Sequence, residues 1–447
     1  MKHALVAAAA ALFLVAAAPS QAAPPEPLPN PDRPAVTPFF RTGGSDASSS
    51  SAASASVARV CPTLRRLARS GNRSVGLRVL NLGTGKDICS LNSLARRSLA
   101  SNNKLFTTST VLDRFGPDRV FRTLVYAAGP IRDGILKGNL YLKGGGDPSF
   151  GTNAFLNSYL AGEGSSVERL AAQIRKRGIR RITGRVFGDD TIFDRLRGVA
   201  DSGYATSPWI GPLSGLSFNA GFTSASLTSF SSNPAGLAAR TLARTLRARG
   251  VKVRIQVGVR KTPARWIRKK GLLAWQNSPD MPWMVRITNL NSVNFWAETL
   301  LKDLGAYIRG KGTTAEGVTV VRRTMASLGV KVWPIDGSGL TYGNRSTAHD
   351  VVKLLYRARR QSWGSSLFQS LPTAGVDGTL ADRMRGSAAQ DRCHAKTGTL
   401  TGVSALSGYC FNLSGKRFAF SILMNGVWNL DRAHRAQDRI AALIARL

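Results

Sequence analysis

The stretch CHAKTGTLTGVSALSGYC, at positions 393–410, predicts two β-strands joined by a short turn. If the turn is centred between Thr401 and Gly402, Cys393 lies opposite Cys410 on the neighbouring strand. The apolar segment RFAFSILMNG, at 417–426, continues the hairpin with a further strand. This pattern predicts an antiparallel sheet at the centre of the fold, with the strand that carries Lys396-Thr397-Gly398 at its edge.

The chain contains four cysteines, an even number that favours disulfides if the protein is exported. Opposed residues on neighbouring strands bring their Cβ atoms close together, so the hairpin favours a Cys393–Cys410 bridge. Cys61 and Cys89 then pair by elimination. The alternative is that the cysteines are free and buried.

The N-terminus has the features of a secretory signal peptide. Lys2 and His3 precede the apolar run ALVAAAAALFLVAAA, and small residues follow in APSQAAPP, which predicts a signal peptide over 1–23. We therefore expect export to the periplasm, the cell wall or the medium. Residues 24–57 are rich in Pro and then in Ser, Ala and Gly, and are expected to form a flexible linker before an ordered chain.

The composition is strongly basic, with 62 Lys and Arg against 25 Asp and Glu and a formal net charge of +37. Such a charge attracts polyanions: nucleic acid, anionic lipid or acidic wall polymers. Export argues against nucleic acid and favours anionic polymers at the cell surface as partners. The alternative is that an Arg-rich composition serves only solubility.

The rest of the chain predicts an α+β fold in which helices pack on the antiparallel sheet. A first part, 58–120, contains a short helix, a hairpin and a further helix, and the last part, 285–447, contains three amphipathic helices and the 393–423 hairpin. Between them, residues 121–284 mix strand patterns such as GNLYLKG with helical patterns such as SVERLAAQIRKRG. This segment is expected to form a large inserted domain of mixed α/β structure.

The segment LASNNKLFTTST, at 99–110, contains the first of three short motifs that together indicate chemistry. Ser101 and Lys104 stand three residues apart at the start of an expected helix, where residues i and i+3 share a face. A lysine in a dry cleft loses proton affinity and can then activate the serine as a nucleophile. Taken alone, the motif is better explained by a helix cap followed by a solvated lysine.

The second and third motifs are S-x-N at Ser292 and Asn294, before an expected helix over 295–304, and K-T-G at 396–398. The set of motifs is similar to that of the penicillin-binding proteins, and this resemblance implies that Ser292 relays a proton to the leaving amine and that Asn294 binds the substrate amide. Lys396 and Thr397 would hold a carboxylate, and Gly398 would leave room for substrate alongside the strand. The backbone N–H groups of Ser101 and Thr399 would stabilise an oxyanion.

Several other candidate features carry less weight. Ser217-Phe218-Asn219 is a second S-x-N motif, but no amphipathic helix follows it. Asp336 is expected to hold a turn near the cleft, and Trp296 and Trp333 are expected in the core. No metal site and no cofactor are expected, because the histidines do not have the spacing of ligands: His3, His349, His394 and His434.

The ordered set S-x-x-K, S-x-N and K-T-G resembles the penicillin-binding proteins and serine β-lactamases. Stretches such as LKGNLYLKGGGDPSF, SVNFWAETLLKDLG and HAKTGTLTGVSALSGY narrow the resemblance to the low-molecular-mass class C penicillin-binding proteins, the D-alanyl-D-alanine carboxypeptidase family S13. Leu99 stands where many relatives have Pro, and Val293 where an acidic or polar residue is common. The resemblance implies a serine DD-peptidase that acts on peptidoglycan stem peptides through an acyl-enzyme on Ser101.

The resemblance also implies inhibition by β-lactams, which would acylate the same serine. It leaves open the balance of carboxypeptidase and endopeptidase action. One alternative is a β-lactamase with the same active-site parts. The other is a non-catalytic wall-binding protein that uses its basic surface.

Overall fold

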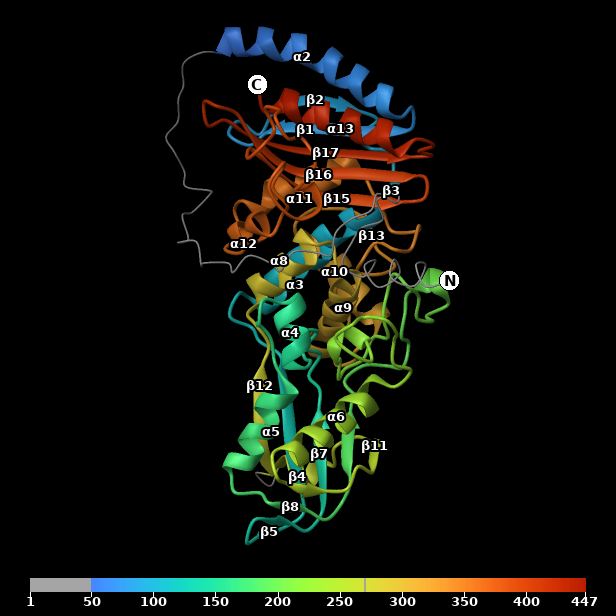
Figure 1. Ribbon diagram of the computed structural model, residues 1–447. Coiled ribbons are helices and arrows are strands. Elements are labelled where there is room, and N and C mark those ends of the chain that lie inside the picture. Colours follow the sequence, from blue (N-terminus) through green and yellow to red (C-terminus); the bar gives the residue numbers. More distant parts are fainter. Residues whose placement is uncertain (1–49, 269–270) are drawn as a thin grey trace.

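The computed structural model describes residues 50–268 and 271–447 and shows a body of sheet and helices at one end of an elongated molecule, with a narrower lobe at the other (Figure 1). The expected signal peptide, 1–23, lies outside the described residues, as does most of the expected linker. Helix α2 (Ser50–Gly71) begins inside that linker, so helical structure starts before Val57. None of the described helices combines the length and hydropathy needed to cross a bilayer.

The body is built on a five-stranded antiparallel sheet in the order β15-β16-β17-β1-β2. Its register pairs Leu400 with Val403 across the turn and Cys393 with Cys410 farther along, as the hairpin pattern predicted. Strand β15 lies at the edge of the sheet. The strands are β1 (Val75–Asn81), β2 (Asp87–Leu91), β15 (Cys393–Leu400), β16 (Val403–Phe411) and β17 (Arg417–Asn425).

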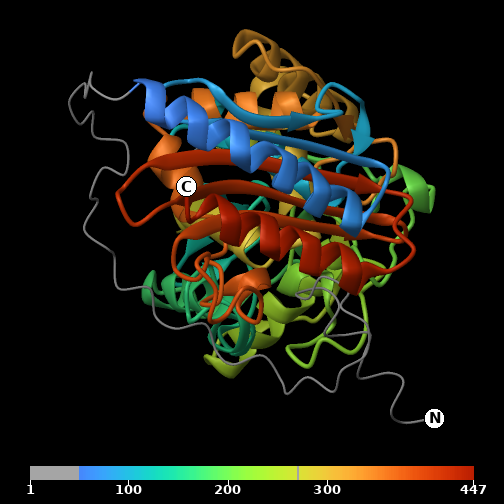
Figure 2. The ribbon, with the colours of Figure 1, turned by 90° about the horizontal axis from the view of Figure 1, so that it is seen from above.

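Helix α2 and the C-terminal helix α13 (Leu430–Ile444) lie side by side over one face of this sheet (Figure 2). Leu64 of α2 and Ile440 of α13 are fully buried there with the apolar side chains of the sheet. Disulfides join Cys61 to Cys89 and Cys393 to Cys410. The bridges therefore tie α2 to β2 and the edge strand β15 to β16.

The other face of the sheet packs on a group of helices that forms the larger core of the body. Trp296 is buried in this core, as expected, but Trp333 is not. Trp333 is 36% exposed and its ring lies under the Arg96 guanidinium, 4.1 Å from the ring centroid. Successive side chains of a strand point to opposite faces, and Val332 takes the buried side of this two-residue strand. The helices are α3 (Lys104–Phe115), α8 (Met281–Leu290), α9 (Asn294–Arg309), α10 (Thr314–Ser327), α11 (Ala348–Ala358) and α12 (Gly364–Gln369).

A three-stranded sheet and short 3-10 turns connect these elements near the edge strand. The backbone N–H of Ser98 donates to Asn425 Oδ1 at 2.8 Å, which ties the segment before Ser101 to the end of β17. The small elements are β3 (Arg97–Ser98), β13 (Val332–Trp333), β14 (Arg345–Ser346), η1 (Ala100–Asn103) and η4 (Gly378–Leu380).

The lobe is formed within the segment 121–284 and has mixed α/β structure. Its larger sheet has the order β11-β9-β7-β4-β12: β4 (Arg122–Ala128), β7 (Asn139–Lys143), β9 (Val186–Asp189), β11 (Val257–Val259) and β12 (Leu272–Asn277). Its smaller sheet has the order β10-β8-β6-β5: β5 (Ile131–Arg132), β6 (Ile135–Leu136), β8 (Arg181–Ile182) and β10 (Lys252–Val253).

Helices α5 (Val167–Lys176) and α6 (Pro234–Ala248) bury their apolar faces in the core of the lobe. Parts of the same segment instead pack into the core of the body, among them Phe155, Ile210 and Phe222. These parts bring the lobe's loops next to the helices that carry the expected catalytic residues. The remaining elements are α4 (Asn153–Tyr159), α7 (Ala264–Arg268), η2 (Ala200–Ser202) and η3 (Asn219–Gly221).

Candidate active site

Ser101 and Lys104 are in direct contact where η1 passes into α3. Lys104 Nζ lies 2.9 Å from Ser101 Oγ. The sequence predicts that Ser101 lies in the first turn of an α-helix. In the structure it lies instead on the 3-10 turn η1, just before α3. Side chains at i and i+3 eclipse one another in a 3-10 turn, which explains why the contact forms there. The preceding Ala100 has a φ of +46°, a strained conformation of the kind that clusters at functional sites.

Lys104 is fully buried and surrounded by hydrogen-bond acceptors. Its Nζ also donates to Asn294 Oδ1 at 2.7 Å and to the Ser338 carbonyl at 2.8 Å. Burial lowers the pKa of Lys104 to about 7, although the carboxylates of Asp336 and Glu298 oppose the shift. Near neutral pH, a large fraction of this amine is therefore unprotonated and able to accept the proton of Ser101.

Ser292 and Lys396 form a second contact beside the first. Lys396 Nζ donates to Ser292 Oγ at 2.8 Å and to the Thr397 carbonyl at 3.0 Å. Burial lowers the pKa of Lys396 well below its usual range, and the nearby Lys104 lowers it further. Ser292 lies between α8 and α9 with a φ of +56°, which makes it a second strained residue in the site. Asn294 belongs to the same group, because its Oδ1 accepts a hydrogen bond from Lys104. Its Nδ2 donates to the Trp209 carbonyl at 3.0 Å.

Gly398 allows strand β15 to lie directly against the turn that carries Ser101. A Cβ atom at this position would lie 2.9 Å from the Leu99 carbonyl oxygen and 3.1 Å from the Asn102 nitrogen. Asn102 Nδ2 donates to the Lys396 carbonyl at 3.0 Å and fastens the two segments. The sequence predicts that this glycine leaves room for substrate, whereas in the structure it leaves room for the backbone of the turn that carries Ser101.

A cavity of about 530 Å³ opens at this junction of α3, α9 and β15. Ser101, Ser292, Asn294 and Thr399 line it, and the aromatic side chains of Trp209, Tyr342 and Trp428 surround them. Lys396 and Thr397 are not in its wall. Lys396 is buried behind Ser292, and Thr397 Oγ1 donates to Thr379 Oγ1 at 2.8 Å. Direct binding of a carboxylate by these two side chains, as expected from the sequence, would thus require them to exchange partners.

The sequence analysis did not identify Glu298, which holds the turn that faces Lys104. Its Oε1 accepts the N–H groups of Gly337 at 2.9 Å and Ser338 at 2.6 Å, and the Ser338 carbonyl in turn accepts from Lys104. Burial, together with the neighbouring Asp336 carboxylate, raises the pKa of Glu298 to about 7. The sequence shows a single acidic residue among Trp296, Ala297, Leu300 and Leu301, which indicates burial but does not reveal its partners at 337 and 338.

Asp336 has the structural role that the sequence predicted. Its carboxylate accepts the N–H groups of Gly339 at 2.7 Å and Thr341 at 2.8 Å, and also the side-chain amide of Asn344 at 2.8 Å. These bonds hold the turn whose Ser338 carbonyl faces Lys104.

The structure also separates the two S-x-N motifs. Ser217 Oγ donates to the Ser214 carbonyl, and Phe218 is buried in the lobe. Asn219 Oδ1 accepts the backbone N–H of Thr152 at 2.9 Å, so this motif has a structural role away from the cavity. In the other motif, Val293 is buried in the core of the body, which explains why a polar residue is not needed there.

The pKa of Lys104 predicts a pH dependence for acylation of Ser101. Below about pH 7 the protonated amine cannot accept a proton, so the rate should rise with pH and level off above about 7. The measurement is the rate of labelling by a fluorescent penicillin between pH 5 and 9. A rate that stays constant or falls over this range would contradict the assignment of Lys104 as the base.

Comparison with known proteins agrees with this geometry. The model of the family "D-Ala-D-Ala carboxypeptidase 3 (S13)" matches residues 63–232 and 222–447. A D-alanyl-D-alanine carboxypeptidase from an Actinomadura strain is 32% identical over 78% of this chain and 77% of its own. Carboxypeptidase DacB of Mycolicibacterium smegmatis is 27% identical over 98% of this chain and 93% of its own.

Among solved structures, penicillin-binding protein 4 (dacB) of Haemophilus influenzae has the same fold. It superposes with a TM-score of 0.69 at 19% identity, and the match covers 85% of this chain and 97% of that one. Three segments far apart in the sequence thus meet at one cavity, on the fold that the sequence predicted. The chain belongs to the D-Ala-D-Ala carboxypeptidase 3 (S13) family.

Proposed function

We propose that this protein is an exported serine-type D-Ala-D-Ala carboxypeptidase that acts on peptidoglycan stem peptides through an acyl-enzyme on Ser101. The observation that carries the proposal is the 2.9 Å contact between Ser101 Oγ and a buried Lys104 whose pKa is about 7. The carboxypeptidases named among its relatives support the substrate class.

In the proposed reaction, neutral Lys104 accepts the proton of Ser101 while Oγ attacks the carbonyl carbon between the two D-alanines. The N–H groups of Ser101 and Thr399 stabilise the oxyanion, and Asn294 binds the peptide amide. Ser292, in contact with Lys396, relays this proton from Lys104 to the leaving amine as the C–N bond breaks, which returns Lys104 to its neutral form. Water then hydrolyses the ester, releases the shortened peptide and restores Ser101.

The direct test is mass spectrometry of the products from purified muropeptides. Loss of one alanine from pentapeptide muropeptides is expected, and cleavage of cross-linked dimers would add endopeptidase action. If neither product forms with folded protein that binds penicillin, the proposal fails.

β-Lactams are expected to acylate Ser101 and to leave slowly. No glutamate lines the cavity in the described part of the chain, so a carboxylate of that kind is not placed to activate the hydrolytic water. Rapid turnover of a chromogenic cephalosporin would instead favour a β-lactamase.

Replacing Lys396 by Met should lower kcat/KM for a D-Ala-D-Ala peptide by about 10- to 100-fold, the effect of losing one charge-assisted hydrogen bond. The reason is its contact with Ser292, together with the hydrogen bond that it can donate to the terminal carboxylate once it exchanges partners. The matched control is the same peptide with an amidated C-terminus, on which the variant should lose less. Unchanged kinetics on the free acid would refute this role.

The positive charge of the chain supports anionic wall polymers as partners in the exported state. Retention on isolated cell walls should then fall as salt rises, because exposed charges are screened over about 10 Å at 0.1 M ionic strength. Retention that 1 M salt leaves unchanged would count against this partner.

A further inference from the structure

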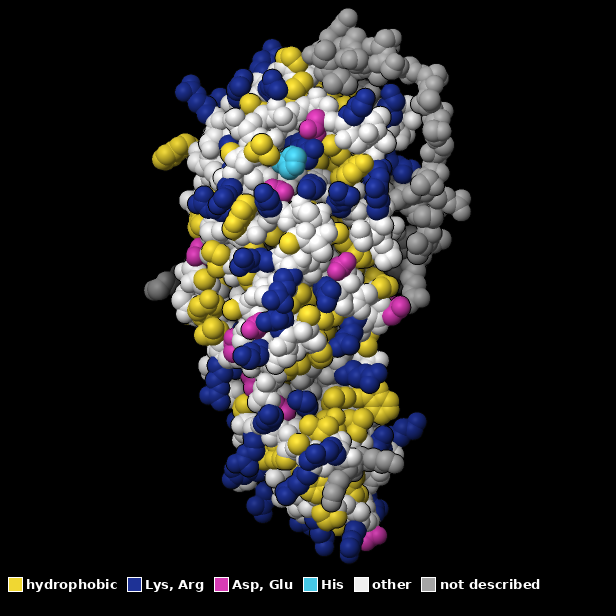
Figure 3. All heavy atoms as spheres, turned by 180° about the vertical axis from the view of Figure 1, so that it is seen from behind, with side chains coloured by type: hydrophobic (Ala, Val, Ile, Leu, Met, Phe, Trp, Pro, Cys, Tyr) yellow, Lys and Arg dark blue, Asp and Glu magenta, His cyan; other side chains and the backbone are white. Residues whose placement is uncertain are grey.

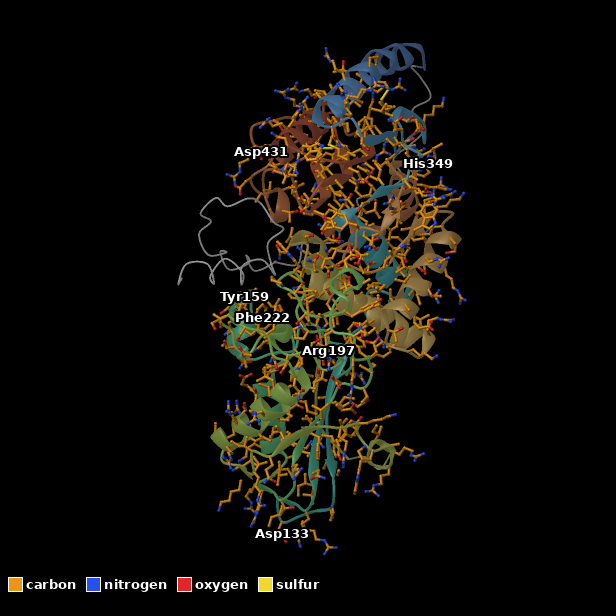
Figure 4. All side chains as sticks on the ribbon, turned by 90° about the vertical axis from the view of Figure 1, so that its right-hand side faces the viewer. Asp133, Tyr159, Arg197, Phe222, His349 and Asp431 are labelled. Carbon is orange, nitrogen blue, oxygen red and sulfur yellow. A yellow bond between two sulfur atoms is a disulfide. The ribbon has the colours of Figure 1, made fainter. Side chains whose placement is uncertain are left out.

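Three segments of the lobe, 129–138, 173–186 and 244–268, which include its free end, carry almost only positive charge. Together they contain 17 Lys and Arg and a single acidic residue, Asp133. All 17 basic side chains are exposed. Figure 3 shows Lys and Arg around this end of the molecule, and Figure 4 places Asp133 at its extremity. We call these three segments the cationic tip.

The charges of the cationic tip are not neutralised by the protein itself. The eight ion pairs found among the described residues all lie outside the three segments. Backbone carbonyls instead orient some of the guanidinium groups: Arg177 donates to Leu272, Arg180 to Asp133 and Arg247 to Val253. These groups are held in place while their full charge remains available to a ligand.

Neighbouring strands of the smaller sheet even place like charges side by side. Lys252 of β10 pairs in register with Arg181 of β8, and both side chains are exposed. Like charges directly opposite one another on a sheet are destabilising. A polyanion lying across these strands would relieve the repulsion.

A shallow hollow at the edge of the cationic tip is lined by side chains that are suited to binding sugars. It is lined by Gln173, Lys176, Arg177, Trp275, Gln276 and Asn277. The Trp275 ring is 45% exposed. An exposed aromatic face can stack on a sugar ring, and the amides of Gln276 and Asn277 can bind hydroxyl groups. The Gln173 amide is bonded through both its nitrogen and its oxygen to the Trp275 backbone, and it holds the ring in place. A lipid surface would not use these amides.

We propose that the cationic tip and this hollow bind an anionic polysaccharide of the cell wall, bearing carboxylate or phosphate groups. The inference rests on the proposed function, because the cationic tip would give the enzyme a second binding site for the cell wall, where the stem peptides occur. Figure 1 shows the cationic tip at the opposite end of the lobe from the sheet that contributes to the cavity. Binding there would hold the enzyme on the wall and raise the local concentration of substrate, without altering the chemistry at Ser101.

The test compares two triple variants with the same change in charge. The tip variant is Lys137→Gln, Arg181→Gln and Lys252→Gln. The control variant is Arg322→Gln, Arg323→Gln and Arg357→Gln, three exposed residues of the body that form no ion pair among the described residues. Binding is measured at 0.1 M salt to polygalacturonate, phosphorylated dextran and neutral dextran, and activity is measured on a soluble D-Ala-D-Ala peptide.

The tip variant should bind one or both charged polysaccharides about tenfold more weakly, since each lost cation removes one contact with the polyanion. The two charged polymers show whether carboxylate or phosphate is preferred. The control variant should bind like the wild type, and both variants should keep wild-type activity on the soluble peptide. Equal loss of binding in the two variants, or no loss in the tip variant, would overturn the proposal.

A further variant tests the role of the sugar ring. Trp275→Ala should weaken binding to polygalacturonate but not to polyacrylate, which carries carboxylates without sugars. Equal effects on both polymers, or tighter wild-type binding to anionic lipid vesicles or single-stranded DNA than to either charged polysaccharide, would also overturn it. If the soluble peptide is not cleaved by any form of the protein, the proposed function fails independently of these binding results.

Discussion

A Ser101→Ala variant is expected to lose covalent labelling by a fluorescent penicillin and to lose about 10⁴-fold or more in carboxypeptidase activity. Without Oγ no acyl-enzyme can form, and the remaining groups can only bind the substrate. Ser101 is half-buried and its hydroxyl contacts Lys104, so its removal should change the folded structure little. The measurements are gel fluorescence after labelling and D-alanine release from a synthetic peptide.

The matched control is Ser217→Ala, which removes the serine of the other S-x-N motif. Among the described residues, Ser217 Oγ bonds only to the Ser214 carbonyl of its own loop, so this variant should keep wild-type labelling. Labelling that persists in Ser101→Ala, or disappears in Ser217→Ala while the protein stays folded, would refute the assignment of the nucleophile.

Replacing Lys104 by Met should slow acylation by about 10³-fold, within the range typical for loss of a general base. Met fills a similar volume, so the buried site stays packed, but it cannot accept the proton of Ser101. The rise of the rate near pH 7 should disappear together with the amine. The measurement is the second-order rate of penicillin acylation across the pH range, with thermal unfolding as a check on the fold.

The Lys104→Arg variant distinguishes the loss of a proton acceptor from the loss of a positive charge. The guanidinium keeps the positive charge but does not release a proton at accessible pH, so this variant should be about as slow as Lys104→Met. The loss of a general base typically slows a reaction by more than tenfold. The proposed role would therefore be contradicted if a folded Lys104→Met protein were acylated within about tenfold of the wild-type rate.

The sequence predicted the parts of the molecule that depend on local pattern. The alternation of apolar residues and the turn at Thr401 and Gly402 were sufficient to predict the hairpin and the pairing of Cys393 with Cys410. The spacing of Ser101 and Lys104 made a contact between them possible, and the two other motifs were needed to favour it over a helix cap with a solvated lysine.

What could not be predicted depends on contacts between distant segments. Glu298 acts through the backbone of 337–338, which no spacing within its own helix reveals. The close approach of β15 to the turn of Ser101 determines the need for Gly398, and a sequence cannot show how near two segments lie. The same holds for Lys396, whose burial behind Ser292 follows from the packing of a strand against a loop.

The central claim, that Ser101 is the residue acylated, can be measured directly. Trypsin should release residues 98–104 as the peptide SLASNNK from penicillin-treated protein, and fragmentation separates Ser98 from Ser101. We expect the mass of one opened penicillin on Ser101. An adduct on Ser98, on Ser292 or on a different peptide would contradict the account.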